Sequence, residues 1–220
     1  NQMIALITTR LMDLQPDVIL VVGGATDIFQ PWSFDPRAGV PYNHFANESL
    51  YDYFFDPRKS AEDAEDLSYD GLQAMIFNRL ENLRALTNWQ SDIWEWEVVR
   101  QFELALRRLA RLAPGIGAPV RFLLQPTVVR KGTLAGAEAG AASGAFLAYL
   151  DRQYERFESV LGRLVMADRA FAARNLSRLF EADTRALFTD IVHVTSEGRQ
   201  VMADRLQAEV VETVGAATAA

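Results

Sequence analysis

The chain has 220 residues, half of them hydrophobic, with a formal net charge of −7 and no cysteine. This composition suffices for one hydrophobic core. It excludes disulfides and cysteine nucleophiles, and it argues against nucleic acid as a partner because no basic stripe is present to neutralise phosphates. No run reaches the roughly 18 apolar residues of a membrane span, while the compartment and the oligomeric state stay open.

The first predicted elements are a helix and a buried strand. Apolar residues recur at helical spacing over 1–14, and Pro16 ends that helix. "DVILVV", 17–22, is continuously apolar and mostly β-branched, which is typical of a strand buried on both faces of a parallel sheet. "GGATD", 23–27, follows as a turn. The aromatic, proline-containing segment over about 28–57 is predicted to form a packed loop or a lid.

The middle of the chain is predicted to hold two helices and a second strand. The acidic residues 61–70 favour a solvated loop, and helical periodicity follows over 70–87 and 91–113. "VRFLLQP", 120–126, predicts the second strand. The small residues of 132–145 indicate a mobile loop that leads into the next helix.

The remaining segments complete an alternating pattern. That next helix extends to about 165, and a short helix is predicted over 167–181. Residues 186–192 are predicted to be a third short strand or an extended loop, followed by a last helix over 196–213. We expect a single domain over 1–214 and a disordered tail over 215–220.

Strands that alternate with helices predict an α/β fold with a parallel sheet and helices on both faces. Three strand candidates are few for such a sheet, and the helix over 1–14 should connect an earlier strand to "DVILVV". We therefore expect these residues to lack the N-terminal strands of the complete domain.

Two polar loops follow strand candidates, and one of them carries Asp190 and His193 three positions apart. The loops at 23–27 and 190–193 should meet at the carboxyl ends of the strands, where open parallel sheets bind ligands. A neutral imidazole can accept the proton of a hydroxyl nucleophile, and a carboxylate can fix its tautomer. Taken alone, the spacing favours a histidine that is only hydrogen-bonded near a helix start, with Asp190 on the surface.

The surrounding blocks resemble those of the SGNH (GDSL-type) hydrolases. "FTDIVHVTSEGRQVMADRLQAEV" is similar to their last block, an Asp-x-x-His before a helix, and "LQPDVILVVGGATDIF" is similar to their third block. "RFLLQP" resembles the strand that follows. "DPRAGVPYNHF", 35–45, resembles an insertion of bacterial members, some of which are linked to surface polysaccharides. The resemblance implies a three-layer α/β/α, flavodoxin-like fold and serine esterase activity.

The resemblance also implies roles for single residues. His193 is the expected base and Asp190 its orienting carboxylate, while Gly24, Thr26 and Asp27 belong to the oxyanion and substrate loop. Gly24 allows a tight turn, and Asp27 is expected to brace the loop. Thr26 stands where the family has an asparagine that donates to the oxyanion, and a threonine hydroxyl is a shorter donor.

The nucleophile of the family is absent, because no Gly-Asp-Ser occurs in the chain. Ser143 in "GAASGAF" comes nearest by composition, but small residues at a helix start explain it better. We expect the serine to precede residue 1 in an intact protein, so that the 220 residues alone are inactive.

The expected function is therefore hydrolysis of an ester, with an O-acyl group such as acetyl on a bacterial polysaccharide as the expected substrate. No metal or other cofactor is expected, since the two histidines form no metal-binding motif. Two alternatives stay open. A non-catalytic carbohydrate-binding or polysaccharide export protein of the same fold is favoured by Thr26. A nucleotide-binding domain that uses "VVGGATD" as a phosphate loop lacks the known phosphate-binding motifs.

Other residues have a structural and a functional interpretation, and the structural one is preferred in each case. His44, beside Tyr42 and Asn43, is interpreted as a packed loop residue rather than as part of a substrate cleft. Asp35 and Arg37 are interpreted as a loop-stabilising pair rather than as a substrate clamp. Core or interface positions are preferred over sugar stacking for Trp89, Trp94 and Trp96.

Overall fold

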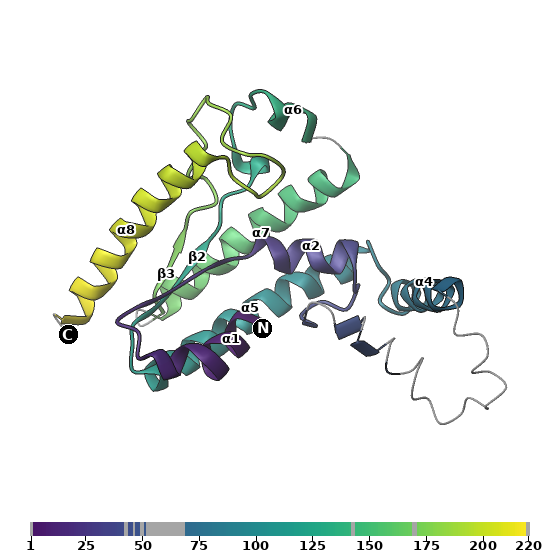
Figure 1. Ribbon diagram of the computed structural model, residues 1–220, viewed down its shortest axis with the longest axis horizontal. Helices are drawn as coiled ribbons and strands as arrows, with labels where there is room; N and C mark the ends of the chain where they lie inside the picture. The colour runs from purple at the N-terminus through teal and green to yellow at the C-terminus, as the bar shows by residue number, and fades with distance from the viewer. Residues whose placement is uncertain are drawn as a thin grey trace.

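The computed structural model describes residues 2–41, 44–45, 47–48, 51, 69–141, 144–168 and 171–218. These residues form a small parallel sheet and several long helices (Figure 1). The helices of eight or more residues are α2 (Ala25–Ser33), α4 (Tyr69–Leu86), α5 (Asp92–Ile116), α7 (Ala145–Ala167) and α8 (Ser196–Thr218). The α/β class with parallel strands is confirmed.

The sheet has three strands in the order β1-β2-β3, all parallel. β1 (Ile19–Gly23) and β2 (Val120–Leu124) lie where the apolar runs predicted them. Their register places Val21 beside Phe122. Within the part of the chain that the structure describes, β1 pairs with β2 alone and so forms an edge of the sheet.

The third strand does not lie where the sequence indicated. β3 (Ala173–Asn175) falls inside the helix predicted over 167–181, so that prediction is wrong. Local preference favoured a helix there, but pairing with β2 overrides it, because the backbone N–H of Phe122 donates to Ala172 O at 2.9 Å. Residues 186–192 join no sheet and form the extended loop of the two alternatives, with one antiparallel bridge between Phe188 and Val194.

Helices cover both faces of the sheet, as predicted. Phe122 of β2 contacts Phe102 of α5, and Phe102 stacks on Phe157 of α7 with ring centroids 3.7 Å apart. The preceding strand residue, Arg121, points to the opposite face. Its guanidinium donates a hydrogen bond to Glu209 of α8 at 2.6 Å. Figure 1 shows α8 apart from α5 and α7, with β2 and β3 between them.

The N-terminal segment is helical, but its geometry changes along its length. α1 (Gln2–Leu6) continues into the π-helical turn η1 (Ile7–Leu11) and the 3-10 turn η2 (Met12–Leu14). Gln15 then adopts a left-handed φ of 48° and ends the helix directly before Pro16. The predicted helix over 1–14 and its end are therefore confirmed over the described residues.

The "GGATD" segment begins a helix, which corrects the predicted turn and loop. Gly24 has a φ of 115°, and α2 starts at the next residue. A Cβ at Gly24 would lie 2.4 Å from Leu124 Cδ1, so the chain requires glycine there to pass β2 closely. Thr26 and Asp27 occupy the first turn of α2, where polar and acidic residues are favoured. The predicted packed loop over 28–57 thus begins with helix, and beyond residue 41 only 44–45, 47–48 and 51 lie within the described residues.

The other long helices agree with prediction but extend further. α5 runs through Pro114 and ends at Gly117, whose φ is 77°. α8 continues to Thr218, where disorder was expected after 214, and it is capped by Thr195, whose Oγ1 accepts the N–H of Gly198 at 3.2 Å. The turn η4 (Val128–Arg130) precedes the loop predicted over 132–145, and the short helix α6 (Ala137–Ala141) lies within it.

Candidate active site

The loop that carries Asp190 and His193 is a closed antiparallel turn. The N–H and the hydroxyl of Thr189 both donate to His193 O, at 2.8 and 3.1 Å. The N–H of Thr195 donates to Leu187 O at 2.8 Å, which places the turn at the start of α8. These bonds close residues 189–193 into a turn that is fixed at both ends.

Asp190 and His193 form the pair that the sequence indicated. The ring Nδ1 of His193 lies 2.7 Å from Asp190 Oδ2. Asp190 Oδ1 accepts the backbone N–H groups of Val192 and His193 at 2.9 and 2.8 Å. One carboxylate oxygen therefore anchors the acid to the turn, while the other orients the imidazole and leaves its Nε2 for another partner.

The pKa of Asp190 is lowered by its surroundings. Partial desolvation acts to raise it, but the two backbone N–H groups and the His193 ring stabilise the carboxylate and outweigh that effect. The acid is accordingly ionised at neutral pH, which is the state that can hold a protonated Nδ1.

The loop is attached to the carboxyl end of β2. Ile191 O accepts the hydroxyl of Thr127 and the N–H of Val128, both at 3.0 Å. Thr127 follows β2 after Gln125 and Pro126, and the N–H of Gln125 donates to Gly23 O at the end of β1. The two polar loops therefore meet at the carboxyl ends of the strands, as predicted.

Thr26, Asp190 and His193 line one pocket of about 340 Å³. The remaining walls of this pocket are apolar and come from α2, α7 and the loop itself. They are Ala25, Phe29, Phe146, Leu150, Ile191 and Val192. The site thus places a polar pair and one hydroxyl beside an apolar surface.

Gly24 and Asp27 do not line this pocket. They lie around a neighbouring pocket of about 510 Å³, which Thr26 shares and which runs along Val22 and Gln125. The Asp27 side chain is open to that pocket, but the surrounding protein restricts its hydration and raises the pKa of the carboxyl group. The predicted site residues therefore divide between two adjoining hollows, with Thr26 between them.

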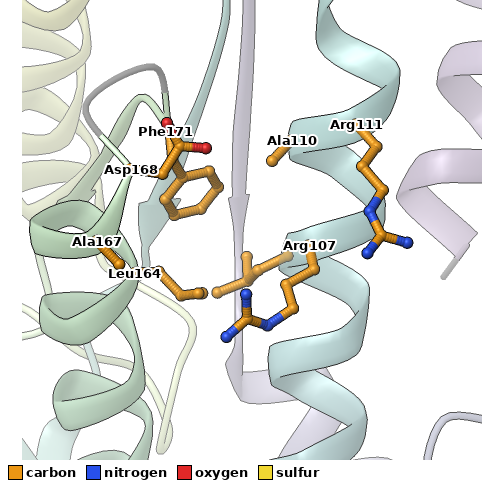
Figure 2. A pocket seen from close by; sticks show the side chains of 8 residues that line it. Arg107, Ala110, Arg111, Leu164, Ala167, Asp168 and Phe171 are labelled. Atoms are coloured by element: carbon orange, nitrogen blue, oxygen red, sulfur yellow. The ribbon is translucent and has the colours of Figure 1, made fainter.

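A third hollow of about 170 Å³ lies near the amino end of β3, away from the candidate site. Figure 2 shows Leu164, Ala167, Asp168 and Phe171 on one side and side chains of α5 on the other. None of the residues predicted for the site lines it.

The other predicted interpretations have clear outcomes. Trp94 is buried in the core and its Nε1 donates to Pro36 O at 2.7 Å, whereas Trp96 is exposed and lies against Arg156. Arg37 pairs with the buried Asp35 at 2.6 Å within its own loop. The loop-stabilising interpretation holds for Asp35 and Arg37, and the core interpretation holds for Trp94, whereas Trp96 is not a core residue.

His44 is the second histidine of the chain, and its Nε2 lies 2.8 Å from Glu48 Oε1. It is absent from the lining of the pocket that contains His193. Tyr42 and Asn43, beside which a substrate cleft was the less favoured interpretation of His44, lie outside the described residues.

No serine lines the pocket of His193 among the residues that the structure describes. Ser143 lies outside those residues. Within the same described ranges, no three side chains of His, Asp or Glu gather as a metal site requires, and no helix is long and apolar enough to cross a membrane.

Sequence reasoning missed the residues that shape the site without chemistry of their own. Phe29 and Phe146 form pocket walls, and Thr127 holds the loop that carries Asp190 and His193. The position of Thr127 directly after a predicted strand was the available signal. The sequence offers no such signal for Phe146, because it lies on a helix that is far from the site along the chain.

Comparisons with known proteins give no relative: the chain matches no protein-family model, no curated protein and no solved structure.

Proposed function

We propose that this chain carries the general base and the orienting acid of a serine ester hydrolase of the SGNH (GDSL) type. The observation that supports the proposal is the 2.7 Å contact between His193 Nδ1 and Asp190 Oδ2 in a pocket shared with Thr26. A carboxylate at Nδ1 keeps the proton there and stabilises the imidazolium that forms later. Nε2 is then free to accept the proton of an attacking hydroxyl.

Thr26 and the first turn of α2 supply the oxyanion region in this proposal. Attack on an ester carbonyl places negative charge on its oxygen, and donors already aimed at that position lower the barrier. The first turn of a helix offers unpaired N–H groups and the positive end of its dipole. Thr26 lies in that turn and on the pocket, so its hydroxyl adds a side-chain donor.

The walls of the pocket favour an acyl group as the part of the substrate that it holds. Phe29, Phe146 and Leu150 offer apolar contacts and no hydrogen bonds, whereas a sugar ring would need several polar partners. The acyl chain fits this surface and the alcohol portion lies toward solvent, which is compatible with an O-acylated carbohydrate.

The proposed reaction needs a serine that the described lining residues do not supply. The test is hydrolysis of p-nitrophenyl acetate by the product of the complete gene and by its His193→Ala variant. We expect a loss of at least about 10³-fold in kcat/KM. The only other histidine gives a matched control: His44→Ala should keep the activity, because His44 does not line the pocket. Equal rates with and without His193 would remove the catalytic assignment.

A non-catalytic glycan-binding protein is the second candidate. It is favoured by Thr26, which stands in place of the family's asparagine, and by the lack of a serine among the described pocket residues. Labelling by a fluorophosphonate separates the two, since only an activated serine reacts. Glycan binding that survives His193→Ala, without labelling or turnover, would favour this second candidate.

A further inference from the structure

A buried ion pair lies beside the candidate site. Lys131 Nζ is 2.6 Å from Glu138 Oε2, and both side chains are fully removed from solvent. Lysine and glutamate are almost never fully buried unless they are paired. A buried pair is seldom more stabilising than apolar residues of the same size, so stability alone explains this one poorly.

The carboxylate of Glu138 also accepts hydrogen bonds from backbone N–H groups. Its Oε1 accepts the N–H groups of Leu187 and Phe188 at 2.8 and 2.9 Å. Its Oε2 accepts the N–H of Ala135 at 2.9 Å, and the Lys131 ammonium also donates to Arg185 O. The pair thus joins the start of α6 to the segment directly before the Asp190–His193 turn.

The carboxylate replaces a neighbouring strand for this segment. Residues 186–192 join no sheet, and Phe188 forms only an isolated bridge with Val194, so the N–H groups of Leu187 and Phe188 have no strand as a partner. Buried backbone N–H groups must be satisfied. Glu138 satisfies two of them, and a small apolar cluster of Val128, Phe180, Leu187 and Phe188 packs the same segment.

We propose that Glu138 is a positioning residue for His193. Its carboxylate, fixed by Lys131, sets the backbone at Leu187 and Phe188, and this backbone sets the turn in which Asp190 meets the imidazole. Glu138 does not line the pocket itself. The catalytic meaning of this role rests on the proposed function, whereas the geometric role can be tested without any turnover.

The test uses the two histidines of the chain as probe and reference. The contacts predict opposite tautomers for the two neutral imidazoles: the Nδ1–H form for His193 beside Asp190, and the Nε2–H form for His44 beside Glu48. Ring ¹⁵N shifts measure each tautomer in the full chain. In Glu138→Gln, an amide NH₂ group replaces the carboxylate oxygen that accepts hydrogen bonds from Lys131 and Ala135. Its N–H donors then face the donors of these two residues, which disturbs the position of the side chain. We therefore expect the Nδ1–H form of His193 to be lost and His44 to stay unchanged.

Glu209→Gln is the matched control, because Glu209 is equally buried and ion-paired but lies on α8 against Arg121 and Arg174. It should leave both histidines unchanged. Should Glu138→Gln fail to fold, Glu138→Asp keeps the charge opposite Lys131 and withdraws the carboxylate by about 1.5 Å, with the same expected loss at His193. An unchanged His193 tautomer in a folded Glu138 variant overturns the proposal.

Esterase activity of the product of the complete gene is a second, independent measurement of this role. A positioning role predicts a roughly 10–100-fold lower kcat for Glu138→Gln on p-nitrophenyl acetate, with little change in KM. If the unsubstituted protein hydrolyses no ester, the proposed function fails while the tautomer measurement still decides the role of Glu138.

Discussion

At the residue scale, Asp190 divides two tasks between its two oxygens. Oδ1 holds the backbone of the turn and Oδ2 orients His193. An asparagine could still accept the backbone N–H groups through its amide oxygen, but it offers no anion to the ring. The two tasks can therefore be separated by a single substitution.

For Asp190→Asn in the complete protein, we expect kcat on p-nitrophenyl acetate to fall by about 10²–10⁴-fold, because the ring loses its tautomer control. The urea midpoint should stay nearly unchanged. Asp183→Asn is the matched control, since Asp183 also accepts a backbone N–H two residues ahead, from Arg185, outside the pocket. Equal losses in the two variants would show that the effect is not specific to His193.

Gly24 is the second residue whose role is set by geometry. Gly24→Ala meets both a φ of 115° and Leu124 at 2.4 Å, so we expect a lower free energy of unfolding, by on the order of 1–3 kcal/mol. Gly162→Ala in α7 has no atom within 4 Å and should stabilise the protein by about 0.5–1 kcal/mol. Urea unfolding of both variants checks the pair, and similar midpoints would contradict the proposed strain.

At the element scale, α8 and the Asp190–His193 turn are in direct contact through a glycine. A Cβ at Gly198, in the first turn of α8, would lie 2.5 Å from Leu187 O and 2.9 Å from Val194 Cβ. Since Leu187 belongs to the segment that Glu138 holds, the start of this helix and the position of His193 are linked. A substitution at Gly198 should thus be felt at the site.

We expect Gly198→Ala to lower the free energy of unfolding by about 1–3 kcal/mol and to shift the amide resonances of Leu187 and Val194. Gly215→Ala, in the same helix with no atom within 4 Å, should leave those resonances in place. NMR spectra of the two variants decide this, and an unshifted turn in Gly198→Ala would rule out the link.

At the scale of the whole molecule, the site depends on a charged contact between distant parts of the chain, which makes its stability dependent on pH. Desolvation acts to raise the pKa of Glu138, but Lys131 and the three backbone N–H groups outweigh it and bring the pKa below its ordinary value of 4.5. A carboxyl group with a lowered folded-state pKa stabilises the fold above its unfolded-state pKa. That contribution is lost as the pH falls through the folded-state value.

Glu138→Gln should therefore cost about 3 kcal/mol of unfolding free energy at pH 7, because Lys131 stays buried without its partner. The cost should shrink as the pH falls below the unfolded-state pKa, near the ordinary value of 4.5, and then through the lower folded-state value, where the original protein also loses the charge. Urea midpoints of both proteins between about pH 3 and 7 measure the difference. A difference that does not vary with pH would contradict the assigned ion pair.

The sequence by itself determined the elements that have strong local patterns. Continuous apolar runs located β1 and β2, helical periodicity located α4, α5, α7 and α8, and the spacing of Asp190 and His193 identified a pair that the fold brings into contact. Each of these is a local property, because a run of neighbours decides burial, and a three-residue spacing within one turn decides the contact.

Only the tertiary structure decided the rest. β3 exists because the edge of β2 pairs with it, although its own residues favour a helix. Thr26 reaches the pocket because Gly24 lets α2 start directly after β1, and Glu138 meets Leu187 across about 50 positions of sequence. Such contacts depend on the position of backbone that is distant in the sequence, and no local sequence pattern predicts that position. The sequence thus indicated the Asp190–His193 pair, while the tertiary structure determined which residues line its pocket and which hold its backbone.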